Sequence, residues 1–532
     1  MQKNILLLTL CLSWLTMPML QAQTIELEAD AEAVKKFMNT ISAEDLKEHL
    51  YILASDEYEG RETGTLGQKK AADYIARHFM KNGLSGPVKD NPNPYFQPIN
   101  FFGRYVSSVQ LSSPNTTLAL GKDFVTRSIS DLQLEDAGLV FIGYGLEMEE
   151  YNDLEGLNLE GKGVVILSGT PTDKKGEPLF EDAPNFRQTY RNLLDKGVRY
   201  IITMPATEEE AQNRISLFGT GVTKPRLSLE KGQSRRASSP SLIASPTAVA
   251  RLFGESPEKF QKTIDKGIKK GKPMGGQYST TASIKFDYRD APIPSENVLG
   301  FLEGTDLKDE VVVVTSHYDH VGVNANGDIN NGADDDGSGT VSVLEMVEAF
   351  AEAAKNGYRP RRSILFMTVT GEEKGLLGSS YYSDNPIFPL DKTVTNLNID
   401  MVGRVDPDRA DDPSYIYIIG STMLSSDLHK ISESVAGKFV SDLELDYKYN
   451  SKDDPQRFYY RSDHYNFAKH NIPIIFYFNG THEDYHRPSD TPDKIEYELM
   501  EKRAKLVFVT AWEIANRDEA PVVDQVANDD DD

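Results

Sequence analysis

The segment VVVVTSHYDH, residues 311–320, joins an apolar run to two histidines and an aspartate. Comparable apolar runs follow at residues 363–370, 395–400, 415–420 and 473–478. Helical stretches lie between them, and one, residues 340–355, places on one face Val341, Leu344, Val347, Phe350 and Ala354. Apolar strands that alternate with amphipathic helices predict an α/β fold with a mixed, mainly parallel sheet sandwiched by helices.

Side chains that bind metal ions cluster around the ends of these predicted strands. The ordered series is His317, Asp319, Asp335, Glu372, Glu373, Asp400 and His486. All except His486 lie directly after a strand or in the loop that follows, which is where such sheets bind ligands. Five of the seven have the right types to hold two divalent ions, and one carboxylate is left to act as a base. That combination predicts metal-assisted hydrolysis.

The TSHYDH segment assigns roles to three of its residues. Residues two apart on a strand face the same side, so His317 and Asp319 can touch. A carboxylate that accepts a hydrogen bond from a ligating imidazole fixes its tautomer. We therefore predict that His317 binds metal and that Asp319 supports it. His320 points the other way on this reasoning, which gives it a structural role.

The remaining members follow later strands. TGEEKGLLGS, residues 370–379, carries Glu372 and Glu373 directly after an apolar run. Adjacent residues diverge in direction, so Glu373 can bind metal while Glu372 reaches the attacking water as general base. LNIDMVGR then adds Asp400, and DYHRPSDTPDKI adds His486.

The segment NNGADDDGSGTVSVLE, residues 330–345, also matches a calcium loop of the form D-x-D-x-S-G-x5-E. A calcium-binding hand needs a helix that leads into the loop, and residues 321–333 are too rich in Gly and Asn to form one. The competing interpretation is a Gly-rich turn that presents one aspartate to a site and then starts a helix at Ser338.

Taken together, HYDH, GADDDGSG, TGEEKGLLGS, NIDMVGR, RSDHYNF and DYHRPSDTPDKI resemble the successive signatures of the secreted bacterial di-zinc aminopeptidases. That superfamily includes leucyl aminopeptidase, glutamate carboxypeptidase, glutaminyl cyclase and the transferrin receptor. The likeness covers most of residues 40–125 and 285–515, and no metal-site motif departs from it.

The resemblance implies two Zn²⁺ per chain and a role for each residue. His317 and Asp400 would serve one ion, Glu373 and His486 the other, and Asp335 would bridge them. Glu372 matches the general base, and Asp319 matches the aspartate that supports a ligand. Two further roles are implied near the site: Tyr485 would polarise the scissile carbonyl, and Arg461 would help to hold the substrate.

Residues 130–255 contain short apolar runs, one helix-like piece near residues 187–196 and none of the nine histidines. This pattern predicts a small β-rich unit without chemistry, and the block resembles an inserted protease-associated domain whose partner is unknown. The expected organisation is a signal peptide at 1–22, peptidase segments at 23–129 and 256–517 around the insert, and an acidic tail at 518–532.

The N-terminus has one Lys, an apolar stretch and small residues near Ala22, a layout typical of a secretory signal peptide. A buried helix and a lipoprotein cleaved before Cys11 are the alternatives. Export predicts a secreted or periplasmic protein, with no membrane span in the mature chain. The formal net charge of −25 argues against a nucleic-acid partner, because phosphate binding needs clustered Lys and Arg.

The function expected from these motifs is hydrolysis of the N-terminal bond of peptide substrates. The alternatives are a carboxypeptidase or dipeptidase on the same scaffold, which would need a basic pocket, and glutaminyl cyclase, which has similar ligands. A non-enzymatic, receptor-like binding protein is a third alternative. An incomplete set of metal ligands would favour it, and the set here is complete. A serine hydrolase is not favoured, because the sequence contains no G-x-S-x-G motif.

Overall fold

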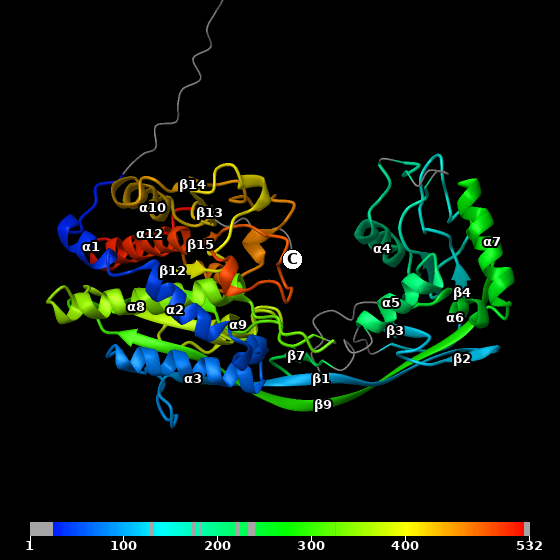
Figure 1. Cartoon of the computed structure of the whole chain (residues 1–532), viewed down its shortest axis with the longest axis horizontal. Helices are drawn as coiled ribbons and strands as arrows, with labels where there is room; N and C mark the ends of the chain where they lie inside the picture. The colour runs from blue at the N-terminus through cyan, green and yellow to red at the C-terminus, as the bar shows by residue number, and fades with distance from the viewer. Residues whose placement is uncertain are drawn as a thin grey trace, which may run out of the picture.

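The computed structural model describes residues 25–126, 132–172, 177–180, 182–218, 224–231, 240–324 and 326–525. The predicted signal peptide, Cys11 and the acidic run at 528–532 lie outside these residues. The chain forms two lobes, and two long antiparallel strands, β1 (Phe96–Ser113) and β9 (Ser279–Leu302), run from one lobe into the other (Figure 1). None of the helices in the described ranges combines the length and apolarity needed to cross a bilayer.

The large lobe is built on a sheet whose central strands are parallel. Its strands are β10 (Leu307–His317), β11 (Arg362–Val369), β12 (Thr393–Ile399), β13 (Tyr415–Ile419), β14 (Glu444–Asp446) and β15 (Ile474–Phe478). They lie in the order β14-β13-β15-β12-β10-β11-β9. Strand β10 is parallel to β11 and β12, β12 is parallel to β15, and β9 and β13 run antiparallel to their neighbours β11 and β15. The predicted mixed, mainly parallel sheet is confirmed.

Helices cover both faces of this sheet, as predicted. They are α1 (Ala31–Met38), α2 (Ala43–Leu53), α3 (Leu66–Lys81), α8 (Gly339–Lys355), α9 (Leu377–Asp384), α10 (Ser426–Phe439), α11 (His464–Ala468) and α12 (Tyr497–Asn516). Alternate valines of β10 belong to different cores. Val312 and Val314 pack with α1, α2, α3, α8, α10 and α12, whereas Val311 and Val313 pack with α9 and α11 on the other face. Burial on both faces of the sheet explains the unbroken apolar run at residues 311–314 of β10.

Helices α2 and α3, near the N-terminus, have clear start and stop signals in the sequence. Helix α2 begins at Ala43, and the Ser42 hydroxyl accepts a hydrogen bond from the Asp45 backbone N–H, as an N-cap does. Helix α3 buries Ala71, Ile75 and Phe79 and ends just before Gly83, which has a φ of +82°. These local signals explain where α2 begins and where α3 ends.

The small lobe is also α/β. Its elements are β2 (Thr116–Leu118), β3 (Phe124–Thr126), β4 (Gln133–Phe141), β5 (Gly163–Leu167), α4 (Phe186–Asp195), β6 (Tyr200–Met204), α5 (Glu208–Phe218), β8 (Ser241–Ala244), α6 (Pro246–Leu252) and α7 (Pro257–Lys270). Strand β7 (Arg226–Ser228) instead pairs with β1 and packs with Phe101 and with Leu377 of α9 in the large lobe. Strands β4, β5, β6 and β8 pair in parallel. The expected single helix is α4, and α5 and α6 were not expected. The core of this lobe draws on Leu111 and Ile284 as well as on Val165, and the domain boundaries at 130 and 255 stay a prediction.

Candidate metal centre

The fold brings the predicted ligands to one edge of the large sheet. His317 is the last residue of β10, and Glu372 and Glu373 follow β11. Asp400 follows β12, and His486 lies in the loop after β15. Asp335 lies in the irregular turn η2 (Ala333–Ser338), directly before α8. The carboxyl ends of the parallel strands thus converge at one place, as such sheets require.

The five side chains meet at short distances. The Nε2 atom of His317 lies 3.2 Å from Asp335 Oδ1 and 3.6 Å from Asp400 Oδ1. The Nε2 atom of His486 lies 2.9 Å from Asp335 Oδ2 and 3.1 Å from Glu373 Oε1. Asp335 therefore stands between the two histidines, with one oxygen toward each.

The nitrogen and oxygen atoms of these side chains are better suited to binding metal ions than to hydrogen-bonding with one another. His317 Nε2, Asp335 Oδ2 and Glu373 Oε1 are buried and make no well-aligned hydrogen bond. Buried polar atoms without partners are costly, and imidazole nitrogens with carboxylate oxygens are common zinc ligands. Burial alone would lower the pKa of His486, but the carboxylates of Asp335 and Glu373 raise it to about 10. The carboxylates at this site therefore carry more negative charge than the nearby side chains balance, which favours the binding of cations.

His320 corrects one expectation, because it faces the site. Its Nδ1 atom lies 2.9 Å from Glu373 Oε1 and 3.8 Å from Asp335 Oδ2, and its side chain is fully buried. The prediction that it points away is wrong because β10 ends at His317. Beyond that residue the alternation of a strand no longer applies. His320 thus joins Asp335 and Glu373 as a third side chain around the same space.

Asp319 supports the site differently from the prediction. The Nδ1 atom of His317 lies 3.0 Å from the backbone oxygen of Asp319 and 3.9 Å from its carboxylate. Donation to this carbonyl leaves the Nε2 lone pair of His317 directed at the site. The Asp319 carboxylate instead accepts hydrogen bonds from the Thr63 hydroxyl at 2.6 Å and from the Glu372 backbone N–H at 3.2 Å. It therefore positions the residue proposed as the base.

Glu372, the predicted base, lies beside His317. One of its carboxylate oxygens lies 3.9 Å from His317 Nε2, and its side chain is 12% exposed. Burial raises the pKa of Glu372 well above its usual range, the nearby His317 opposes this, and Glu373 and Asp400 add to it. A carboxyl group with a raised pKa can accept a proton and release it again near neutral pH.

Tyr485 and Arg461 border the same space. A hollow that is open to solvent has ten described residues around it: Asp335, Glu372, Asp400, Met401, Phe458, Arg461, Phe476, Phe478, Thr481 and Tyr485. The ring of Tyr485 stacks on that of His486, with centroids 3.9 Å apart. The Arg461 guanidinium lies over the Phe458 ring at 4.6 Å. The hollow is thus acidic at the ligands and mostly apolar elsewhere.

Residues 297–511, which contain all of the site residues predicted from the sequence, match the sequence profile of Peptidase family M28. This range, called the M28 segment below, is similar to that family. The matched range begins within β9 and ends within α12, so the M28 segment covers most of the large lobe but leaves out its N-terminal helices and β1.

Named relatives agree with this assignment. The aminopeptidase YwaD of Bacillus subtilis (strain 168) is 28% identical over 48% of this chain and 52% of its own length. A probable leucine aminopeptidase of Arthroderma otae is 30% identical over 39% of this chain and 55% of its own length. The chain thus spans about half the length of the curated relatives it matches.

Solved structures show the same fold over nearly the whole chain. The aminopeptidase from Aneurinibacillus sp. strain AM-1 aligns with a TM-score of 0.56 at 20% identity, covering 93% of this chain and 98% of its own. BSAP, a zinc aminopeptidase from Bacillus subtilis, aligns with a TM-score of 0.53 at 19% identity, covering 90% of this chain and 96% of its own. At this identity the likeness is one of fold.

The calcium-loop interpretation of the M28 segment fails on its side chains. Asp334 Oδ1 accepts hydrogen bonds from the Gly403 backbone N–H and the Ser338 hydroxyl. Both oxygens of Asp336 also accept backbone N–H groups, and Glu345 lies against His49, on α2. These carboxylates therefore do not converge on one ion, and the Gly-rich turn that presents Asp335 is what the structure shows.

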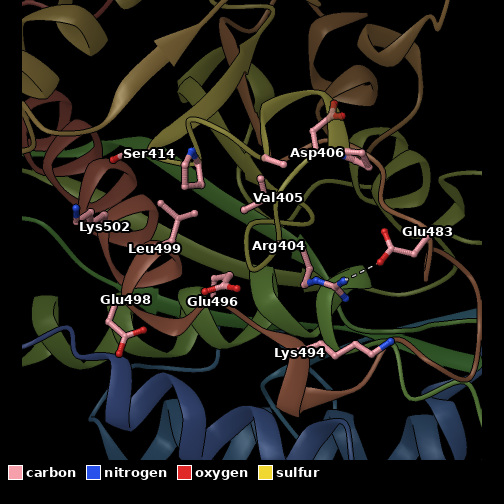
Figure 2. Close-up of a pocket in the computed structure, with 13 residues that line it drawn as sticks. Arg404, Val405, Asp406, Ser414, Glu483, Lys494, Glu496, Glu498, Leu499 and Lys502 are labelled. Atoms are coloured by element: carbon pink, nitrogen blue, oxygen red, sulfur yellow. Dashed lines mark ion pairs between the residues drawn. The ribbon is translucent and has the colours of Figure 1, made fainter.

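A larger pocket in the M28 segment lies apart from the ligands. It is lined by Arg404, Lys494 and Lys502 among others, and by none of the predicted site residues in the described chain (Figure 2). Arg404 is held there by Asp484 at 3.1 Å and lies 3.9 Å from Glu483, the pair that Figure 2 marks with a dashed line. This arginine is therefore not part of a basic pocket around the metal ligands.

Arg61 is a supporting residue that the sequence analysis missed. Its buried guanidinium donates hydrogen bonds to four backbone oxygens, those of Leu53, Tyr318, Asn331 and Gly332. Tyr318 directly follows His317, Gly332 lies three residues before Asp335, and Leu53 is the last residue of α2. Arg61 therefore connects the segments that carry both predicted ligands to α2. A single sequence gives no signal that separates such an arginine from an exposed one.

We predict that Arg61→Lys destabilises the chain and loosens the metal centre. An ammonium group cannot reach four carbonyls that a planar guanidinium joins, so buried acceptors lose their donors. The expected loss in the free energy of unfolding is about 2–4 kcal/mol, measured by urea denaturation. The control is Arg77→Lys on α3, whose ion pair with Asp73 is exposed, and no more than about 0.5 kcal/mol is expected there. Equal stability of the two variants would contradict the assignment.

Proposed function

We propose that the chain is a zinc-dependent aminopeptidase that hydrolyses the N-terminal bond of peptides. The observation that carries the proposal is the convergence of His317, Asp335, Glu373, Asp400 and His486 at the edge of a hollow with apolar walls. His317 and Asp400 would hold one ion, Glu373 and His486 the other, and Asp335 both. Bound zinc supplies Lewis acidity, which polarises a carbonyl group and makes water a stronger acid.

The chain's own residues would then handle protons and charge. Glu372 borders the hollow and would take a proton from the attacking water and pass it to the leaving amine. The Tyr485 hydroxyl would donate a hydrogen bond to the oxygen that gains charge. Asp319 would keep Glu372 in place through its backbone N–H. Ser462, which donates to Asp400 Oδ2 at 2.6 Å, would fix that carboxylate.

The charges in the hollow favour the amino end of a peptide. Asp335, Glu372 and Asp400 line it, and Arg461 is the single cation among its described residues. A carboxypeptidase would need several cations, and Arg404 is paired elsewhere. The lack of a basic pocket among the described residues of the hollow therefore favours the amino end of a peptide over its carboxylate end.

The hollow also predicts which peptides are cleaved. Met401, Phe458, Phe476 and Phe478 would surround the first side chain of the substrate, so apolar first residues should react fastest. In a peptide-library digestion with added zinc, we expect trimming from the N-terminus, with leucine or phenylalanine ahead of aspartate by roughly 10-fold or more in kcat/KM.

The same digestion separates the alternatives. Trimming from the C-terminus would establish the carboxypeptidase alternative, and cyclisation of an N-terminal Gln without hydrolysis would point to an acyltransferase. An intact library at full zinc loading would favour a binding protein. Any of these three outcomes would overturn the proposal.

A further inference from the structure

A second group of metal-binding side chains lies on the helices of the large lobe, away from the sheet edge. His49 is on α2, His78 is on α3, and Glu345 and Glu348 are on α8. Helices α2 and α3 both pack against α8, as Figure 1 shows for the large lobe. None of these four residues contributes to the proposed peptidase chemistry.

The four side chains face one another. His49 Nε2 lies 3.7 Å from Glu345 Oε1, and His78 Nε2 lies 3.6 Å from Glu348 Oε1. The two imidazole rings cross at 85° with centroids 4.8 Å apart. One potential ligand atom from each of His49, His78 and Glu348 lies within 4.8 Å of the others. Four ligands around a tetrahedral zinc ion are about 3.4 Å apart, since each bond is about 2.0–2.1 Å long.

One buried oxygen in this group has no hydrogen-bond partner. Glu345 Oε1 is buried without a hydrogen bond, and the side chain is only 1% exposed. Such an oxygen is costly to bury unless a proton or a cation neutralises it. Burial raises the pKa of Glu345 to about 8, and the neighbouring Glu348 adds to the effect. A divalent ion would balance these two carboxylates.

The surroundings allow an ion to enter and be held. The Glu348 side chain is 39% exposed, which gives access from solvent. His49 Nδ1 lies 2.6 Å from the Tyr74 hydroxyl, and donation to this oxygen leaves the Nε2 lone pair directed at Glu345. His78 Nε2 contacts the Leu344 carbonyl at 3.2 Å and the Asn82 side-chain amide nitrogen at 3.1 Å, and it would exchange these contacts for the ion.

We propose that His49, His78, Glu345 and Glu348 form an additional, structural zinc site that ties α2 and α3 to α8. Two imidazoles with two carboxylates suit Zn²⁺, whereas Ca²⁺ and Mg²⁺ prefer oxygen ligands alone. Helix α8 begins directly after the turn that carries Asp335. The additional ion would therefore brace the element from which the metal centre is presented.

The test counts zinc in the full chain after dialysis against buffered free Zn²⁺. We expect about three ions per chain for the wild type and about two for His49→Gln and for Glu348→Gln. Turnover should fall by no more than a few-fold, because the five ligands of the metal centre stay in place. The control is Glu352→Gln, one turn further along α8, where the carboxylate contacts Asn356 and not the histidines. That variant should keep all the zinc of the wild type.

A second background separates this site from the metal centre. Asp335→Ala should retain about one ion per chain, and the double variant Asp335→Ala, His49→Gln should retain none. Equal zinc in the wild type, His49→Gln and Glu348→Gln would overturn the additional site even if the peptidase proposal holds. Circular dichroism identifies any variant that fails to fold, and Glu348→Gln, at a partly exposed position, then decides the matter.

Discussion

Glu372→Gln is expected to keep its zinc and lose nearly all turnover. Glutamine has the same shape but cannot take a proton from water, and Glu372 is not among the five residues that converge as ligands. General base catalysis contributes about 10²–10⁴-fold, so kcat should fall by that factor while KM changes little. The measurements are steady-state kinetics on an amino-acid 4-nitroanilide and zinc per chain on the same sample.

The matched control for Glu372 is Glu62→Gln. Glu62 accepts ion pairs from Lys374 at 2.8 Å and from Lys224 at 2.9 Å, so it is a nearby carboxylate outside the hollow. Turnover of this variant should stay within a few-fold of the wild type, because Glu62 is not among the described residues that line the hollow. If Glu372→Gln kept a tenth or more of the wild-type turnover, or lost zinc in parallel with activity, its role as base would be wrong.

The large lobe was predictable because its signals are local. An apolar run such as residues 311–316 is buried on both faces, and the helix at 340–355 carries its own periodic stripe. Ligands that directly follow strands inherit their position from the sheet, so Glu373 and Asp400 could be placed without knowing the tertiary contacts. Helix α5, EEEAQNRISLF, lacks a comparable stripe and was missed.

The parts of the site that could not be predicted depend on contacts between distant segments. Arg61 donates to Tyr318, 257 residues further along, and nothing in the local sequence signals this. His320 was placed by strand alternation, which ends three residues earlier, at His317. The partner of His317 is a backbone oxygen of Asp319, and side-chain patterns carry no information about carbonyl directions.

Substitution of the adjacent residues Asp335 and Asp336 should have different effects: the first should lower the zinc content, and the second should lower the stability. Asp335 lies 3.2 Å from His317 Nε2 and 2.9 Å from His486 Nε2, and its Oδ2 makes no well-aligned hydrogen bond. Asp335→Ala therefore removes the one carboxylate that faces both histidines. We expect the zinc content to fall by about two ions per chain, and turnover to fall with it, because both ions lose a ligand and a negative charge.

Asp336 makes the comparison decisive, because its carboxylate is already used within the protein. It accepts hydrogen bonds from the backbone N–H groups of His317, Gly339 and Met401 at 2.9–3.1 Å. Asp336→Ala leaves three buried donors unpaired, each worth about 1–3 kcal/mol, so the free energy of unfolding should drop steeply. Asp335→Ala, measured without metal by urea denaturation, should lose far less stability. Normal zinc in Asp335→Ala, or metal loss without destabilisation in Asp336→Ala, would mean that Asp336 and not Asp335 joins the two ions.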